Sequence, residues 1–253
     1  NNTLVVGLGQ TTSFRQAGPG ELGLYRTTTG TAPWTDIDPG DTFASRNITG
    51  IAARGTSIVV ATTDGIFRTT NTGTNWTMIS GNGTSGLPAG ISYDLVADPS
   101  DDTILYTNAG TNGVYKSEDT GATWSIVGQT TITNSMTNLI NVEIAVGSGD
   151  NVFVAIVTGT NNVFRLSAFF YSSDGGDNWQ SLDLPTTTEM GGTIGIHPGG
   201  QGDQHLSLTA DPDDASVVNI GGDRQPWSNE PNRNGPFFPN ASGAGDFSGR
   251  LFR

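Results

Sequence analysis

The sequence predicts an all-β protein built from repeated antiparallel sheets, and three observations lead to this prediction. A short turn segment ending in tryptophan recurs, with its tryptophans roughly 40 to 55 residues apart, a period typical of repeat architectures. Glycine is abundant, with 36 residues in 253, whereas charged residues make up only 14%, as expected for short strands joined by tight turns. No stretch has the apolar periodicity of an amphipathic helix of three turns.

Each copy of the repeated segment has the same physical interpretation. An apolar run precedes it, at residues 65–67, 113–115 and 168–170, and indicates a strand. The central Asp or Asn can accept hydrogen bonds from backbone N–H groups further along, and the Gly after it can adopt a positive φ. The Trp then opens the next strand with a large apolar surface. The residues assigned to this structural role are Asn71, Gly73, Trp76, Ser117, Asp119, Gly121, Trp124, Ser172, Asp174, Gly176 and Trp179.

The copy at residues 117–124 reads Ser-Glu-Asp-Thr-Gly-Ala-Thr-Trp and resembles the Asp-box, or BNR, repeat, whose pattern is Ser-x-Asp-x-Gly-x-Thr-Trp. The copy at residues 172–179 has Asn178 in place of Thr, the copy at residues 69–76 departs further, and residues 26–34 form a degenerate copy. Asp-boxes occur in sialidases, family 74 xyloglucan hydrolases, sortilin-type receptors and a photosystem assembly factor, which are all β-propellers. In those families the box lies on an outer hairpin, so the resemblance implies that Asp119 and Asp174 lock turns and bind no ligand.

The resemblance implies a β-propeller of four-stranded antiparallel blades, with about five blade equivalents in this chain. The approximate blades are residues 1–45, 46–88, 89–135, 136–200 and 201–253. The first blade has segments for only three strands, at residues 2–9, 20–27 and 34–37, and the last blade lacks its outermost strand. We therefore expect an excerpt of a longer propeller whose first and last blades are incomplete. Copies of the chain could associate through the open blade edges.

The charge of the chain restricts its partners. A formal net charge of −13 and a pI near 4.2 disfavour binding to nucleic acid and to anionic membranes. There is no cysteine, so neither disulfides nor thiol chemistry is expected, and no segment is suited to membrane insertion. These features are typical of secreted bacterial surface proteins and predict an extracellular or cell-surface location. No cofactor is expected, although an acidic surface is compatible with bound Ca²⁺.

The long insert at residues 222–245 is the best candidate region for ligand binding, because propeller ligands usually lie on the channel mouth and its loops. Of the 11 Lys and Arg residues, four are arginines from position 224 onward, and such side chains bind carboxylates or sugar hydroxyls. The candidate ligand-binding residues are His205, Asp223, Arg224, Gln225, Trp227, Asp246 and Arg250. The insert is expected to be ordered and to pack beside His205. Alternatively, these Asp and Arg residues form ion pairs that hold a long loop in place.

Signatures of catalysis are weak in this chain. A sialidase would carry a Phe-Arg-Ile-Pro stretch early, which residues 13–16, Ser-Phe-Arg-Gln, do not match. A family 74 hydrolase uses two facing aspartates, and Asp64 matches the Arg-Thr-Asp-x-Gly-Gly context of the first only loosely, so an ordinary hairpin residue is expected. His197 and His205 with Asp203 could bind a metal, but their spacing is not a recognised one, and exposed loop histidines are the simpler interpretation. No catalytic residue and no metal ligand is assigned.

The sequence therefore favours a non-catalytic extracellular or cell-surface module that recognises a glycan or a protein. Two alternatives stay open at this stage. One is a polysaccharide-active glycoside hydrolase of the xyloglucanase or sialidase kind, and the other is an assembly scaffold, for which the photosystem factor is the example. A pair of carboxyl groups across the channel, about 5–10 Å apart, would favour the enzyme, and its absence would favour binding.

Overall fold

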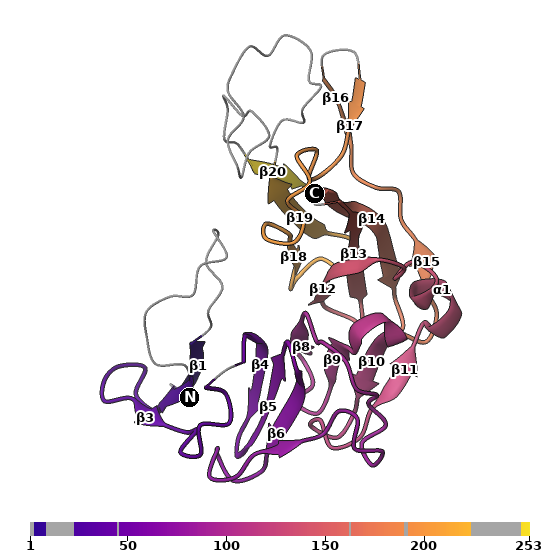
Figure 1. Cartoon of the computed structure of the whole chain (residues 1–253). Coiled ribbons are helices and arrows are strands. Elements are labelled where there is room, and N and C mark those ends of the chain that lie inside the picture. Colours follow the sequence, from indigo (N-terminus) through magenta and orange to yellow (C-terminus); the bar gives the residue numbers. More distant parts are fainter. Residues whose placement is uncertain (1–2, 9–22, 45, 162, 190–191, 224–248) are drawn as a thin grey trace. The chain divides into compact units, whose positions relative to one another are not determined.

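The computed structural model describes residues 3–8, 23–44, 46–161, 163–189, 192–223 and 249–253. These residues contain twenty strands, β1–β20, one α-helix of five residues and one short 3-10 helix (Figure 1). The chain forms two structural units, Asn1–Val127 and Gly128–Arg253, and each is described by itself. The predicted all-β class is confirmed.

The first unit contains three antiparallel sheets, in each of which strands that follow one another in sequence are neighbours. The first sheet is β1 (Leu4–Leu8), β2 (Gly23–Thr27) and β3 (Thr35–Asp36). The second sheet is β4 (Ile48–Arg54), β5 (Ser57–Thr62), β6 (Gly65–Thr69) and β7 (Thr77–Met78). The third sheet is β8 (Leu95–Ala97), β9 (Leu105–Asn108), β10 (Val114–Ser117) and β11 (Ser125–Val127), with the 3-10 helix η1 (Gly110–Asn112) between β9 and β10.

The second unit has the same type of sheet and one hairpin. It opens with the helix α1 (Gln129–Thr133). Its four-stranded sheet is β12 (Leu139–Val146), β13 (Val152–Thr160), β14 (Val163–Ser172) and β15 (Gln180–Ser181). The hairpin is β16 (Thr187–Glu189) and β17 (Gly192–Ile194). The last sheet is β18 (Ser207–Ala210), β19 (Val218–Asp223) and β20 (Gly249–Phe252).

The middle sheet of the first unit is packed on both faces, as the burial of β5 shows. Val59 belongs to an apolar cluster with Leu105 of the third sheet and with Trp124. Val60, which points to the opposite face, belongs to a second cluster with Leu24 of the first sheet. Because alternate residues of a strand face opposite sides, one strand contributes to both cores and the three sheets stack face to face.

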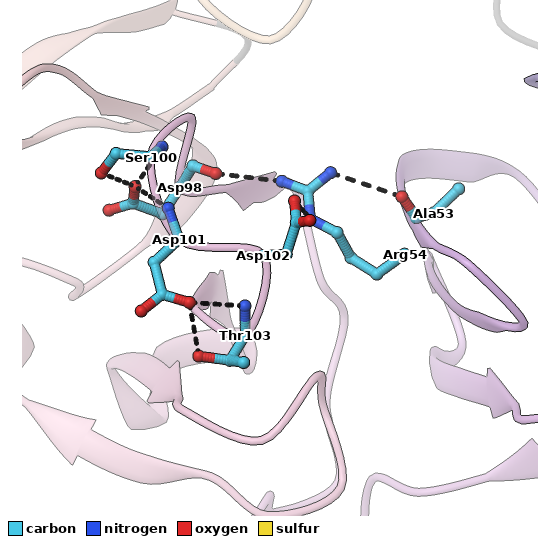
Figure 2. Close-up of polar contacts among 7 residues, drawn as sticks. All are labelled: Ala53, Arg54, Asp98, Ser100, Asp101, Asp102 and Thr103. Carbon is cyan, nitrogen blue, oxygen red and sulfur yellow. Dashed lines mark hydrogen bonds and ion pairs between the residues drawn. The ribbon is translucent and has the colours of Figure 1, made fainter. Parts of the chain in front are cut away.

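Arg54, the last residue of β4, links the second sheet to the third (Figure 2). Its Nη2 atom donates a hydrogen bond to the carbonyl oxygen of Asp98 at 3.0 Å, and its Nε atom lies 3.2 Å from Oδ1 of the exposed Asp102. The Asp98 carboxylate accepts hydrogen bonds from the N–H groups of Ser100 and Asp101, at 2.7 and 3.0 Å, which fixes the turn that Arg54 contacts. A single arginine thus joins a strand end to the turn of the neighbouring sheet.

Two elements differ from what the sequence predicts. The hairpin β16–β17 was not expected, because Thr187–Glu189 and Gly192–Ile194 lack the apolar alternation that identifies strands. The sequence predicts an insert at residues 222–245, but β19 continues through Asp223. Gly222 and Asp223 suggested a loop from their residue types alone, whereas pairing opposite Arg250 and Gly249 of β20 keeps them in the strand.

Candidate functional site

The repeated turn at Ser117 is closed by hydrogen bonds within the turn itself. Oδ1 of Asp119 accepts hydrogen bonds from the Ser117 hydroxyl at 2.9 Å and from the Thr123 N–H at 2.8 Å. The buried indole of Trp124 donates to the carbonyl of Gly121 at 3.1 Å. Burial alone would raise the pKa of Asp119, but hydrogen bonds from Thr123 and Ser117 outweigh this effect and lower it. The carboxylate is thus engaged within its own turn, as the sequence predicts.

The turn at Ser172 repeats this geometry. Oδ1 of Asp174 accepts hydrogen bonds from the Ser172 hydroxyl and from the N–H of Asn178, both at 2.8 Å. The Asn178 side chain donates to Oδ2 at 2.7 Å, and the indole of Trp179 donates to the Gly176 carbonyl at 2.8 Å. The hydrogen bonds to its carboxylate, first the one from the Asn178 side chain, lower the pKa of Asp174 to about 2. Asn178 therefore replaces Thr in the pattern without loss of the turn.

The turn at Thr69 shows that an uncharged side chain can close the same turn. Oδ1 of Asn71 accepts hydrogen bonds from the Thr69 hydroxyl at 2.7 Å and from the Asn75 N–H at 3.0 Å. These are the contacts that an Asp makes in the other two copies. The acceptor oxygen, rather than the negative charge, is the feature that the three turns share.

Trp76 differs from Trp124 and Trp179, because its indole donates to the carbonyl of Ile37 in the preceding sheet region at 2.8 Å. Gly73 is pressed against the same residue: a Cβ at this position would lie 2.4 Å from the Ile37 oxygen, and its φ is +91°. This turn is therefore part of the contact between two successive sheets. In the degenerate first copy, Trp34 is 40% exposed and is not a core residue.

Two of the predicted ligand-binding residues, Asp223 and Arg250, lie on the neighbouring strands β19 and β20 (Figure 1). Arg250 is buried, and its Nη1 atom donates hydrogen bonds to the Thr187 hydroxyl at 2.7 Å and to the Ile194 carbonyl at 3.3 Å. Thr187 and Ile194 are the paired residues at one end of the β16–β17 hairpin. A buried guanidinium bonded to the chain in this way favours a role in holding the hairpin.

His197 is fully buried, so the prediction of an exposed loop histidine is wrong for this residue. The Nε2 atom of its ring lies 3.6 Å from Oδ1 of Asp223, and its backbone N–H donates a hydrogen bond to the Asp223 backbone carbonyl at 3.2 Å. Gly222 makes room for the ring, because a Cβ there would lie 2.4 Å from Nε2. Burial lowers the pKa of His197 to about 4, with a smaller opposing effect from the backbone of His205. At neutral pH the imidazole is therefore uncharged.

The remaining predicted ligand-binding residues are only partly covered by the structure. His205 is half-buried, and its N–H donates to the carbonyl of Gln201 at 3.3 Å. The predicted packing of the insert beside His205 falls on residues that are not described. The candidates outside the described residues are Arg224, Gln225, Trp227 and Asp246.

A pocket of about 480 Å³ lies in the second unit, beside β14 and β17. Its polar lining residues are Arg165, Thr186 and Thr193, and Arg165 donates from Nη2 to the carbonyl of Pro198 at 3.0 Å. The described lining contains neither an acidic nor an aromatic residue. Its apolar side chains are Leu166, Leu184, Pro185, Ile194, Ile196 and Pro198. Sequence reasoning missed this pocket, because Arg165 reads as an ordinary residue of a blade strand.

Within the described ranges, no cluster of at least three His, Asp or Glu side chains could hold a metal ion. No helix in that part of the chain is long and apolar enough to span a bilayer.

Comparison with solved structures defines the fold. The GH74 xyloglucanase of Xanthomonas campestris matches 88% of this chain with a TM-score of 0.56 and 15% identity, over 33% of its own length. An ancestral GH74 enzyme matches all of this chain with a TM-score of 0.54 and 16% identity, over 31% of its length. YCF48 bound to D1 peptide matches 89% of this chain with a TM-score of 0.52 and 14% identity, over 65% of its length. The chain thus spans about a third of either GH74 enzyme.

The protein is a β-propeller of four-stranded antiparallel blades, with about five blade equivalents. In the described residues the first and last blades have three strands each. No protein-family model matches the chain, and no curated protein matches it in sequence. At sequence identities of 14–16%, the similarity to these structures defines the fold alone.

Proposed function

We propose that this β-propeller is a non-catalytic module that binds a protein or a glycan through the pocket beside β14. The observation that carries the proposal is the lining of the pocket. It consists mainly of apolar side chains, its polar side chains are those of Arg165 and two threonines, and its described residues include no carboxylate. Pockets of this kind, mainly apolar with a few placed polar groups, are typical ligand sites. We place the protein outside the cell or at its surface, on the basis of its acidic, cysteine-free composition.

We also assign the repeated turns as Asp-boxes. Asp119 and Asp174 make the same set of hydrogen bonds to a Ser hydroxyl and to the N–H four residues later. In both copies the tryptophan indole donates to the carbonyl of the turn glycine. A recurring local geometry of this kind supports a structural repeat, with the ligand site elsewhere on the blades.

The alternative of a glycoside hydrolase has less support from the described residues. Hydrolysis of a glycosidic bond needs two carboxyl groups that flank the bond. The described lining of the pocket offers none. Asp64, the loose match to a family 74 aspartate, lies in the turn between β5 and β6 and pairs with Arg46 at 3.5 Å. The likeness to GH74 enzymes therefore supports the fold and not the chemistry.

A scaffold role would be a special case of protein binding. YCF48, which has a similar fold, has been solved with a bound D1 peptide. A propeller of this general type can therefore hold a peptide, although nothing follows for the identity of the ligand here. The strongly acidic charge of −13 favours a partner that does not itself present a large negative surface.

The test is a binding panel combined with a product assay. The purified chain is offered immobilised neutral polysaccharides, including xyloglucan, together with arrays of proteins and peptides. We expect saturable binding to at least one class, no release of shorter oligosaccharides, and weaker binding by Leu184→Asp, which places a charge in the pocket wall. Oligosaccharide release by the purified chain would contradict the non-catalytic part. Binding that Leu184→Asp leaves unchanged would contradict the assignment of the pocket.

A further inference from the structure

We propose that the pocket beside β14 takes an extended peptide segment that carries a carboxylate group next to an apolar side chain. The proposal rests on the proposed binding function and specifies its ligand class. Three features of the second unit support it: an open strand edge, an apolar pocket lining, and an arginine at the rim that has no acidic partner among the described residues.

The open edge belongs to β14. On one side this strand pairs with β13 along its length. On the other side, β15 pairs with it opposite Phe170 and Tyr171, and Gln201 forms a parallel bridge to Phe164. Between these contacts, no described strand pairs with residues 165–168 on that side. Unpaired backbone groups at a strand edge readily take up an extended peptide as an additional strand.

The pocket is lined by side chains of this stretch of β14, since both Arg165 and Leu166 contribute to it. Leu166 of β14 lines it together with Leu184, Ile194 and Ile196. Alternate side chains of an added strand point to the same side, so a peptide paired with β14 would direct apolar side chains into this volume. A glycan is less well matched, because sugar rings commonly stack on aromatic side chains and the described lining has none.

Arg165 supplies the charge that selects a carboxylate. Its side chain lies at the exposed rim, and the hydrogen bond to the Pro198 carbonyl fixes the guanidinium there. In the described part of the chain it has no acidic partner, whereas Arg46 and Arg54 pair with aspartates. A guanidinium has five N–H donors and matches a carboxylate in a two-point contact. In a chain of net charge −13, an arginine of this kind marks a local site for an anion.

The test uses synthetic peptides of about six residues, the usual length of a strand, with alternating apolar residues in randomised order. Each peptide is made in three forms. The first has a free C-terminal carboxylate, and the second has a C-terminal amide and one internal Asp or Glu. The third has a C-terminal amide and no acidic group. Fluorescence anisotropy with the whole chain should show binding by one of the two acidic forms, and the form that binds identifies the source of the carboxylate. The uncharged form should bind at least about tenfold more weakly.

Substitution of the arginine gives the second arm of the test. Arg165→Gln should weaken binding of the acidic peptide by about tenfold and leave binding of the uncharged peptide unchanged. The melting temperature of the protein should not change. Lys116→Gln is the matched control, because Lys116 pairs with Glu118 at 2.8 Å in the first unit. It should leave peptide binding unchanged.

Several results would overturn the proposal. Equal binding of charged and uncharged peptides would remove the role of Arg165. Glycan binding that Leu184→Asp abolishes, without any peptide binding, would leave the module function standing and overturn the peptide ligand. Self-association of the chain that Arg165→Gln abolishes would show that a second copy occupies the pocket. If neither the polysaccharides and proteins of the binding panel nor the synthetic peptides bind, the proposed module function is overturned as well.

Discussion

The imidazole Nε2 of His197 lies 3.6 Å from Oδ1 of Asp223, and both side chains are buried. Burial lowers the pKa of His197 from 6.5 to about 4. In the unfolded chain the His197 imidazole takes up a proton near pH 6.5, whereas in the folded chain it does so only near pH 4. Because the unfolded state binds more protons between these two pH values, lowering the pH through this range favours unfolding. We expect His197 to lower the free energy of unfolding by roughly 3 kcal/mol as the pH falls from 6.5 to 4, and to have no such effect above pH 6.5.

Urea unfolding at a series of pH values checks this prediction. His197→Asn should flatten the dependence between pH 4 and 6.5, while His205→Asn should keep it. A ring titration of His197 by NMR with a pKa above 6.5 would contradict the prediction. It would show that Asp223 forms an ion pair with a charged imidazole.

Asp119 is expected to stabilise its turn through acceptor oxygens. Asp119→Ala removes the hydrogen bonds from Ser117 and Thr123 and should lower the free energy of unfolding by about 1–2 kcal/mol. Asp119→Asn is the matched control and should retain most of this stability, because Asn71 closes the equivalent turn. Equal losses for both substitutions in denaturant unfolding would show that the charge matters more than the acceptor.

Arg54 is expected to stabilise the contact between the second and third sheets (Figure 2). Arg54→Ala loses the bond to the Asp98 carbonyl and should lower the free energy of unfolding by about 1–2 kcal/mol. Asp102→Asn should have little effect, because the Asp102 side chain is 91% exposed and surface ion pairs contribute little. Thermal melting of both variants measures the difference. If Asp102→Asn were the more damaging change, the ion pair and not the carbonyl contact would hold the sheets.

Arg250 is expected to hold the β16–β17 hairpin. Arg250→Ala removes bonds to Thr187 and Ile194 from a buried cation and should lower the free energy of unfolding by about 2–3 kcal/mol. Arg253→Ala, on an exposed neighbour, should change it little. If Arg250→Ala instead kept the melting temperature and lost ligand binding, Arg250 would be a ligand contact, the other role considered for it.

Local features of this fold could be predicted from the sequence, because they depend on neighbouring residues. The turn of Asp119 is closed by bonds within seven residues, and the apolar run at residues 168–170 lies in β14 (Val163–Ser172). His197 could not be placed in this way. Its burial depends on Gly222 of β19, a residue distant in sequence where a Cβ would clash with the ring.

The candidate site residues likewise divide into those that the sequence identifies and those that only the structure brings together. Charge clustering in the sequence identified Asp223 and Arg250, which do lie on paired strands. The pocket itself combines residues of β14 and β17 with the segments that precede β16 and follow β17. Each of these segments is unremarkable in sequence, and Arg165 becomes a candidate only when the structure shows its rim position without an acidic partner among the described residues.

The most direct test of the binding-module proposal is chemical-shift mapping of the chain with the tightest ligand from the panel. We predict saturable shifts of the backbone amides of Leu166, Thr193 and Ile196, which line the pocket. The same ligand should leave the amides of the Asp119 turn unshifted. Saturable shifts confined to the first unit, with the pocket amides unmoved, would contradict the account.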